Sequence, residues 1–186
     1  MYKIIDNFIN ESEFIELKKW CLNQKFLKIK NDRNSAWDNI LTKDSGIDIY
    51  KPMYVDIIDN CDETIIQNYE KKISKIIKEL KWTHHNLYSR IHKFGYGSGI
   101  LIHNDKSEKS YTDRVAATLY LNDNWNPNSG GELIIYNNKK EPKDIILPKR
   151  NRLCVVYDEL HKVSVNLNKY VDRLSIQTFA HCKMGK

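Results

Sequence analysis

Hydrophobic positions along the chain follow a helical period in the first half and a strand-like period in the second half. The first helical stretch follows Asn10, which is expected to cap a helix because Glu13 stands three positions later. Ile9 and Phe14 can pack across the first turn of this helix as a hydrophobic staple. Its apolar side is predicted to contain Phe14, Leu17 and Leu22.

The second helical stretch follows Asn60 and Glu63 and is predicted to pack one face on a sheet. The apolar residues of that face are Ile65, Tyr69, Ile73, Ile76, Ile77 and Leu80. Between the two helices, residues 30–52 are rich in Asp, Asn, Ser and Gly around an isolated Trp37. This composition predicts a long loop or an irregular hairpin, and loops of that length are often functional.

From about residue 86 the chain changes to short β-type runs separated by turn residues. Eight runs are expected to be strands: LYSRIHKF, GILIH, VAATLYL, GELIIY, DIILP, RLCVVY, HKVSV and RLSIQTF. Turn signals between several of them predict two packed antiparallel sheets. The fold class is therefore mainly β with flanking helices (α+β), and the architecture that fits best is a jelly-roll barrel with the helices packed on one sheet.

Composition narrows the class of protein further. A length of 186 residues fits one domain, and 41% hydrophobic with 29% charged residues is typical of a soluble protein without an apolar run that could span a bilayer. The N-terminal residues do not resemble a secretory signal, so a cytoplasmic location is expected. The four cysteines are too widely spaced for a metal knuckle or a redox pair, and they are expected to be buried, reduced thiols.

The net charge of +6 raises the question of a nucleic-acid partner, because phosphate binding draws on clustered lysine and arginine. Apart from short runs such as Lys71-Lys72 and Lys139-Lys140, the basic residues are scattered. This distribution favours a solvated basic surface and makes a nucleic-acid partner a minor hypothesis. A modest positive field would also attract a small dianion.

His103 and Asp105 carry the first candidate chemistry. They lie two positions apart at the end of the GILIH strand, so their side chains point to the same side and can share one metal ion. A His-x-Asp pair alone is weak evidence, but His161 near the start of a late strand supplies a third ligand. Two imidazoles and one carboxylate form the facial triad of non-haem Fe(II) oxygenases, which leaves open coordination positions. Taken alone, His161 could also be an ordinary histidine at a strand start.

Arg173 begins the last strand, one strand beyond His161. Together, HND (103–105), ATLYLND (117–123), SGGELIIY (129–136), LHKV (160–163) and DRLSIQTF (172–179) resemble the prolyl hydroxylase branch of the Fe(II)- and 2-oxoglutarate-dependent dioxygenases. The resemblance covers the barrel half well and the helical half loosely. It implies a double-stranded β-helix of jelly-roll or cupin type, occupying a single domain over residues 1–186. Residues 1–85 would be helical support with a substrate-side loop, and residues 86–182 would be the barrel core.

The resemblance also implies roles for individual residues. His103, Asp105 and His161 match the iron ligands, Arg173 matches the basic residue that holds the distal carboxylate of 2-oxoglutarate, and Tyr120 matches a tyrosine that bonds the same carboxylate. A guanidinium suits that task because its planar fork of donors fits a carboxylate. Tyr120 could instead be a core aromatic. Weaker expectations are cosubstrate or pocket contacts for Tyr88, Arg90 and Lys93, and substrate contacts for Trp37, Tyr111 and Arg114.

The implied activity is hydroxylation of a C–H bond, with O2 as oxidant and conversion of 2-oxoglutarate to succinate and CO2. Prolyl residues in a peptide or protein are the favoured substrate, and ascorbate is the expected reductant. A free amino acid or another small molecule is the closest alternative, because the metal ligands and Arg173 would look the same. A nucleic-acid demethylase is less favoured because such enzymes typically carry a second arginine six residues after the first, where this chain has Phe179. A non-catalytic binding barrel would be expected only if a metal ligand were missing.

Overall fold

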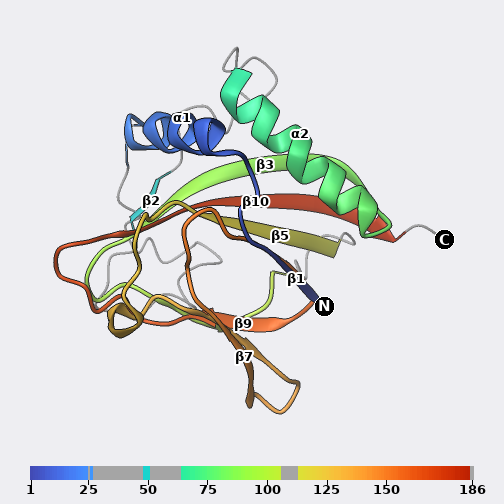
Figure 1. Ribbon diagram of the computed structural model, residues 1–186. Coiled ribbons are helices and arrows are strands. Elements are labelled where there is room, and N and C mark those ends of the chain that lie inside the picture. Colours follow the sequence, from blue (N-terminus) through green and yellow to red (C-terminus); the bar gives the residue numbers. More distant parts are fainter. Residues whose placement is uncertain (25, 27–47, 51–63, 106–112, 185–186) are drawn as a thin grey trace.

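The computed structural model describes residues 1–24, 26, 48–50, 64–105 and 113–184. Within them the chain forms two helices, one 3-10 turn and two antiparallel sheets that face each other (Figure 1). The helices are α1 (Glu11–Leu22) and α2 (Thr64–Glu79), and the 3-10 turn is Pro127–Ser129. The strands are β1 (Tyr2–Ile5), β2 (Asp48–Tyr50), β3 (Trp82–Phe94), β4 (Ile100–His103), β5 (Asp113–Tyr120), β6 (Leu133–Tyr136), β7 (Pro142–Ile146), β8 (Leu153–Tyr157), β9 (Leu160–Val163) and β10 (Arg173–Met184).

The larger sheet has six strands in the order β1-β8-β5-β10-β3-β2, and the smaller sheet has four in the order β4-β9-β6-β7. All strand pairs are antiparallel. From β3 to β10, successive strands mostly alternate between the two sheets, as expected for the predicted jelly-roll barrel. Each strand of the larger sheet therefore shows one face to the barrel interior and the other face to the helices.

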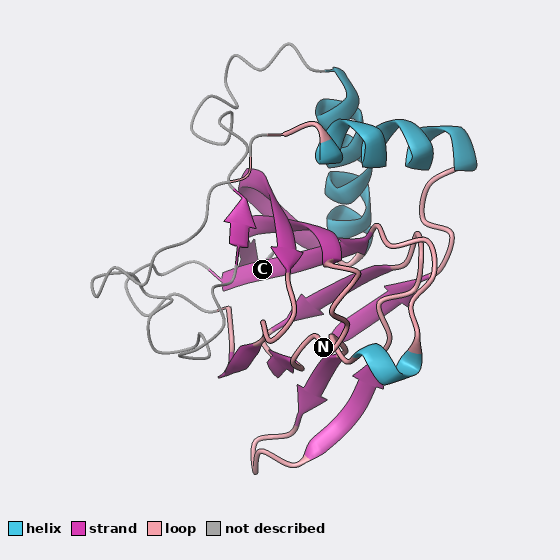
Figure 2. Cartoon of the chain, turned by 90° about the vertical axis from the view of Figure 1, so that its left-hand side faces the viewer, coloured by secondary structure: helices cyan, strands magenta, loops and turns pink. Residues whose placement is uncertain are grey.

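Both helices cover the outer face of the larger sheet, as predicted (Figures 1 and 2). One core cluster joins Phe14 and Leu17 of α1, Ile73 and Ile77 of α2 and alternate residues of the central strands such as Ile91. A second cluster fills the barrel between the two sheets. The predicted cap is confirmed, because the side chain of Asn10 accepts from the backbone of Glu13 and completes a capping box.

Some of the sequence predictions need correction. The inner side of α1 contains Phe14, Leu17 and Cys21, whereas Leu22 is 52% exposed, because the helix ends there and turns Leu22 away from the sheet. The described part of α2 begins at Thr64. All eight predicted strands are present, but β1 and β2 were not predicted. Both are short strands at the edges of the larger sheet, where pairing with a neighbour matters more than an internal hydrophobic pattern.

Other expectations from composition can be compared with the described residues. Cys21, Cys154 and Cys182 are buried thiols, as predicted, and Cys61 lies outside the described residues. Among the helices that the structure describes, none combines the length and the apolar character needed to cross a membrane.

A small polar network connects α2 with the larger sheet. Ser89 Oγ donates to Glu70 Oε1 over 2.7 Å and lies 2.9 Å from Thr178 Oγ1, which in turn donates to the hydroxyl of Tyr69 over 3.3 Å. Burial raises the pKa of Glu70, and the hydrogen bond from Ser89 only partly offsets this effect. A group whose pKa is raised in the folded state stabilises the protein at pH values below its unfolded-state pKa. This contribution is lost as the pH rises through its folded-state pKa.

Glu70→Gln is therefore expected to raise the melting temperature at pH 7 by about 2 °C or more, because the neutral amide still accepts from Ser89. The difference from wild type should shrink toward pH 4, where Glu70 is protonated in both folded and unfolded chains. Thermal unfolding followed by circular dichroism at both pH values measures this. Glu13→Gln is the matched control of opposite sign, since Lys72 lowers the pKa of Glu13. A lower melting temperature for Glu70→Gln at pH 7 would contradict the prediction.

Candidate active site

His103 and His161 come from neighbouring strands of the smaller sheet. His103 is the last residue of β4, His161 lies in β9, and the two are direct register partners with ring centroids 4.3 Å apart. Asp105 follows β4 by two residues, so its carboxylate returns to the same side. Its Oδ1 lies 3.8 Å from His103 Nε2, and its Oδ2 lies 3.5 Å from His161 Nε2. Strand pairing thus brings His161 to His103 and Asp105, which lie more than fifty residues earlier in the chain.

The two imidazoles present the same ring nitrogen to the centre of the cluster. Nδ1 of His103 lies 2.8 Å from the carbonyl oxygen of Leu101, and Nδ1 of His161 lies 2.9 Å from that of Glu159. A proton on each Nδ1 can be donated to the carbonyl, which leaves the Nε2 lone pair for a metal ion. Burial, followed by the proximity of His161, lowers the pKa of His103, so the neutral, ligating form is favoured.

The donor atoms of His103, Asp105 and His161 all lie within 4.8 Å of one another. Within the described residues, this is the one group of at least three histidine, cysteine or acidic side chains with such spacing. Two imidazole nitrogens and one carboxylate on one side of a metal ion are a suitable ligand set for Fe(II) with open positions. The side chains are only 8–14% exposed, so an ion would be largely shielded by protein.

Arg173 is a buried cation at the start of β10. It is 2% exposed, and its guanidinium carbon lies 5.0 Å from the ring centroids of both Phe94 and Tyr120. Its Nε donates to the carbonyl of Gly131 over 2.7 Å, and one terminal nitrogen donates to Ser175 Oγ over 3.3 Å. No acidic side chain among the described residues forms an ion pair with it. Burial lowers the pKa of Arg173, yet a guanidinium remains charged in proteins.

Gly131 positions that arginine, a role that the sequence did not reveal. Its φ is +73°, and a Cβ there would come within 2.9 Å of both Arg173 Cδ and Trp125 Cζ2. Trp125 in turn donates from Nε1 to the carbonyl of Gly130 over 2.7 Å. Gly130 and Gly131 lead from the 3-10 turn into β6, and both have positive φ. Because Gly131 has no Cβ, the backbone there can lie directly against Arg173.

One cavity between the two sheets contains both features. The three candidate metal ligands and Arg173 line it together, along with Phe94 and Phe179. The hydroxyl of Tyr120 is buried beside Arg173 and has no acceptor for its proton among the described residues, while burial raises the pKa of Tyr120 and keeps that proton in place. A buried guanidinium without a carboxylate and a buried hydroxyl without an acceptor together form a fitting environment for the carboxylate of a bound ligand.

The same cavity includes polar residues that were not predicted. His92, Thr118 and Gln177 line it, and Thr118 Oγ1 donates to Gln177 Oε1. Burial, followed by the positive charges of Arg90 and Arg173, lowers the pKa of His92 to about 3, so His92 is neutral at physiological pH. Thr118 is two residues from Tyr120 on β5 and Gln177 is four residues from Arg173 on β10, so each faces the same side as that residue, and this is the signal that could have identified them. His92 on β3 has no such predicted residue within the cavity.

The weaker predicted residues fall into different places. Tyr88 and Arg90 lie on the inner face of β3, since Tyr88 packs 5.4 Å from the ring of the cavity residue Phe179 and Arg90 lies over Tyr88. Lys93 is on the opposite face, where its Nζ is 3.0 Å from Asp172 Oδ2. Lys93 is therefore not placed to contact the cosubstrate or the pocket, because odd and even positions of a strand face opposite sides of the sheet.

Arg114 is on the inner face of β5, in register with His181 of β10. Trp37 and Tyr111 lie outside the described residues. The structure therefore brings the metal-type cluster and Arg173 to one cavity, with Tyr120 buried beside Arg173. It places Tyr88, Arg90 and Arg114 on the sheet face that continues from this cavity.

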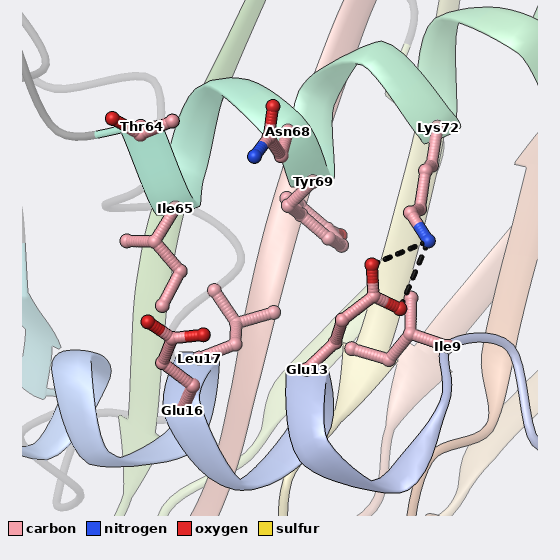
Figure 3. Close-up of a pocket in the computed structure, with 9 residues that line it drawn as sticks. All are labelled: Ile9, Glu13, Glu16, Leu17, Thr64, Ile65, Asn68, Tyr69 and Lys72. Carbon is pink, nitrogen blue, oxygen red and sulfur yellow. Dashed lines mark hydrogen bonds and ion pairs between the residues drawn. The ribbon is translucent and has the colours of Figure 1, made fainter.

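A second cavity lies between α1 and α2 on the outer side of the larger sheet (Figure 3). Lys72 and Glu13 face each other across it, with 2.8 Å between Lys72 Nζ and Glu13 Oε1. Leu17, Ile65 and Tyr69 supply its apolar walls. Its main charges are thus already paired, and it lacks the metal-type cluster of the described residues. The cavity between the sheets is therefore the candidate active site.

Comparison with known proteins agrees with this geometry. The family model for the 2OG-Fe(II) oxygenase superfamily matches residues 89–181, which contain all three candidate metal ligands and Arg173. A sequence comparison with curated proteins gives no match.

Several solved structures share the fold. A prolyl-4-hydroxylase from Pseudomonas putida is 18% identical, with 98% of this chain and 92% of that chain covered and a TM-score of 0.69. A prolyl hydroxylase from Trichoplax adhaerens, in complex with a peptide fragment of the hypoxia inducible factor oxygen degradation domain, is 21% identical, with 97% and 83% covered and a TM-score of 0.74. HygX from Streptomyces hygroscopicus, with nickel and 2-oxoglutarate bound, is 10% identical, with 97% and 82% covered and a TM-score of 0.64.

These likenesses confirm the double-stranded β-helix that the sequence predicted. The matched family uses Fe(II) as its cofactor and 2-oxoglutarate and O2 as reactants, and the donor set of the cavity fits these groups. The chain therefore belongs to the 2OG-Fe(II) oxygenase superfamily and is a 2-oxoglutarate-dependent dioxygenase with the fold of the prolyl hydroxylases.

Proposed function

We propose that His103, Asp105 and His161 hold Fe(II), that Arg173 and Tyr120 bind the distal carboxylate of 2-oxoglutarate, and that the enzyme hydroxylates prolyl residues of a peptide or protein. The observation that carries the metal and cosubstrate assignments is a single buried cavity. It contains a His-Asp-His cluster and an arginine that has no acidic partner among the described residues.

When bound, Fe(II) and 2-oxoglutarate supply the oxidising chemistry, in which O2 is consumed and 2-oxoglutarate becomes succinate and CO2. The contribution of the chain is positioning. Arg173, already held by Gly131 and Ser175, presents its remaining donors without further ordering, and Phe94 and Tyr120 keep water away from that ion pair. His92 is neutral and so adds a polar contact without a second charge in the depth of the cavity.

The prolyl peptide is supported by the fold shared with two prolyl hydroxylases, one of them in complex with a peptide. An extended substrate would also match the inner face of the larger sheet, which continues past the cavity along β3, β5 and β10. A nucleic-acid substrate has less support, because position 179 is a phenylalanine that packs on Tyr88 and lines the cavity. Ascorbate is included in the proposal as the reductant that maintains Fe(II).

Succinate production from 2-oxoglutarate under air tests the proposal, with Fe(II), with and without ascorbate, and with or without proline-rich peptides. Wild-type enzyme is expected to form succinate, faster with a suitable peptide, and the peptide should gain one oxygen atom on a prolyl residue by mass spectrometry. Free amino acids and methylated DNA are the comparison substrates. Oxygen incorporation into one of these and into no peptide would contradict the prolyl proposal, and no succinate under any condition would contradict the iron and 2-oxoglutarate assignments.

A further inference from the structure

Arg90 lies on the inner face of the larger sheet, on the same strand as the cavity residues His92 and Phe94. Its neighbours Ser89 and Ile91 point to the helices, since Ser89 bonds Glu70 of α2 and Ile91 belongs to the helix-side core. Arg90 therefore points into the barrel, as His92 does. In the sheet it stands directly opposite Gln177, which lines the cavity.

Aromatic packing holds the Arg90 side chain, and at least one of its donors is left without an acceptor among the described residues. The guanidinium carbon is 5.3 Å from the centroid of the Tyr88 ring, and Tyr88 packs on the cavity residue Phe179. The Nε of Arg90 is buried and has no hydrogen-bond partner. Among the described residues, no acidic side chain forms an ion pair with Arg90. A guanidinium in this state has a planar fork of donors available for an anion that the chain itself does not provide.

This anion is not the cosubstrate carboxylate bound by Arg173. Arg173 pairs with Phe94 in the sheet, whereas Arg90 pairs with Gln177, four residues further along β10. At about 3.4 Å per residue the backbone positions of these two rows are about 14 Å apart. A five-carbon dicarboxylate is about 6 Å long at C–C bond lengths of about 1.5 Å. The guanidinium of Arg90 lies over Tyr88, which is still further from Phe94 along β3, so Arg90 is beyond the reach of a 2-oxoglutarate anchored at Arg173.

We propose that Arg90 binds a carboxylate of the substrate, so that the enzyme selects compounds with an acidic group close to the hydroxylated carbon. The inference rests on the proposed function, because it takes the cavity as the active site. The carboxylate could belong to an aspartate or glutamate of a peptide or to a small acid, and the chemistry of recognition is the same. Arg114 extends this cationic face, since it also points inward from β5 and its buried Nε also lacks a hydrogen bond.

The overall charge of the chain agrees with an anionic substrate. A net charge of +6 produces a positive field that accelerates encounter with anions and weakens with salt. The specific selection would come from Arg90, because a charge-assisted hydrogen bond in a partly buried site is stronger than a surface ion pair.

Binding to the full chain loaded with Mn(II) and 2-oxoglutarate tests the inference without requiring turnover. The first probes are pentapeptides centred on proline that differ in one neighbouring residue, which is Glu, Gln or Lys. The second probes are free amino acids and their amides. Wild-type protein is expected to bind the acidic member of a set about tenfold or more tightly than its neutral match. A preference for the acidic member among the peptides would identify a peptide side chain as the source of the carboxylate. The same preference among the small molecules would identify a small acid.

Arg90→Gln should reduce the ratio of acidic to neutral affinity to about one, and Arg90→Glu should reverse it in favour of the Lys peptide. Lys93→Gln is the matched control, because it removes a positive charge three residues along the same strand but on the opposite face, and it should retain the wild-type ratio. An acidic preference that survives in Arg90→Gln would overturn the inference. Equal affinity for the acidic and neutral members of both sets, or no binding of either member, would also overturn the inference.

The proposed function is tested separately, by measuring the succinate that the Fe(II)-loaded protein forms from 2-oxoglutarate in the absence of substrate. If this reaction depends on His161 but Arg90 has no effect on acidic preference, only the inference about the substrate fails. If no such succinate forms, the proposed function itself fails.

Discussion

His161→Ala is expected to lower succinate formation by at least about a hundredfold, because it removes one of the three proposed metal ligands. The two remaining ligands, His103 and Asp105, come from one strand end and leave the metal ion without its anchor on β9. Affinity for Fe(II), or for Mn(II) under air, should fall in parallel when measured by calorimetry. Loss of turnover and loss of metal affinity together indicate ligation, whereas a folding defect would also lower the melting temperature of the metal-free protein.

His181→Ala is the matched control for this prediction. His181 is also a strand histidine, but it lies on β10 with its ring 5.9 Å from Tyr88, outside the cluster of metal-type ligands. Metal affinity should remain at the wild-type level in this variant. If His161→Ala bound metal and formed succinate as well as His181→Ala did, the assignment of His161 as a ligand would be wrong.

Arg173→Gln is expected to raise the KM for 2-oxoglutarate by about a hundredfold, because two charge-assisted hydrogen bonds to a carboxylate contribute roughly 1.5–3 kcal/mol each. Metal affinity should be unchanged, since Arg173 is not a ligand. Arg173→Lys should restore only part of the loss, because an ammonium group cannot form the planar two-point contact of a guanidinium. Steady-state kinetics with varied 2-oxoglutarate, under saturating Fe(II), measures the KM of both variants, and calorimetry measures the metal affinity.

The stability of Arg173→Gln separates a binding role from a structural one. Arg173 is a buried charge without an ion pair to the described residues, so its replacement by a neutral side chain should not lower the melting temperature of the ligand-free protein. Arg150→Gln provides the control for net charge, since Arg150 pairs with Glu11 on the surface. An unchanged KM combined with a clearly lower melting temperature would show that Arg173 stabilises the fold and does not bind the cosubstrate.

The largest part of the fold was predictable because the strands of a barrel have a clear sequence pattern. Each of the eight predicted runs became a strand, from β3 to β10, since one side of each run is apolar and must be buried. The edge strands β1 and β2 were missed. Their main stabilisation is backbone pairing with β8 and β3, and backbone pairing depends on a neighbour and not on side-chain type.

The candidate site was predictable to the extent that its chemistry is local. His103 and Asp105 share one strand end, so their spacing alone places them on one side. His161 and Arg173 were assigned by their order in a family pattern, and the structure brings both to the same cavity. Lys93 shows where this reasoning ends. Its place on the same strand suggests a pocket contact like those expected for Tyr88 and Arg90. Its odd-numbered position, however, turns its side chain to the outer face of the sheet, where it pairs with Asp172.

By itself, the sequence determined the class of fold and the set of groups that can bind metal and carboxylate, because residue type and strand periodicity are properties of the chain. Only the tertiary structure decided that His103 is the register partner of His161, that Gly131 holds Arg173, and that Arg90 is left without an acidic partner in the described residues. The physical reason is that such contacts join residues far apart in the chain, and strand register and strand face determine which of them meet.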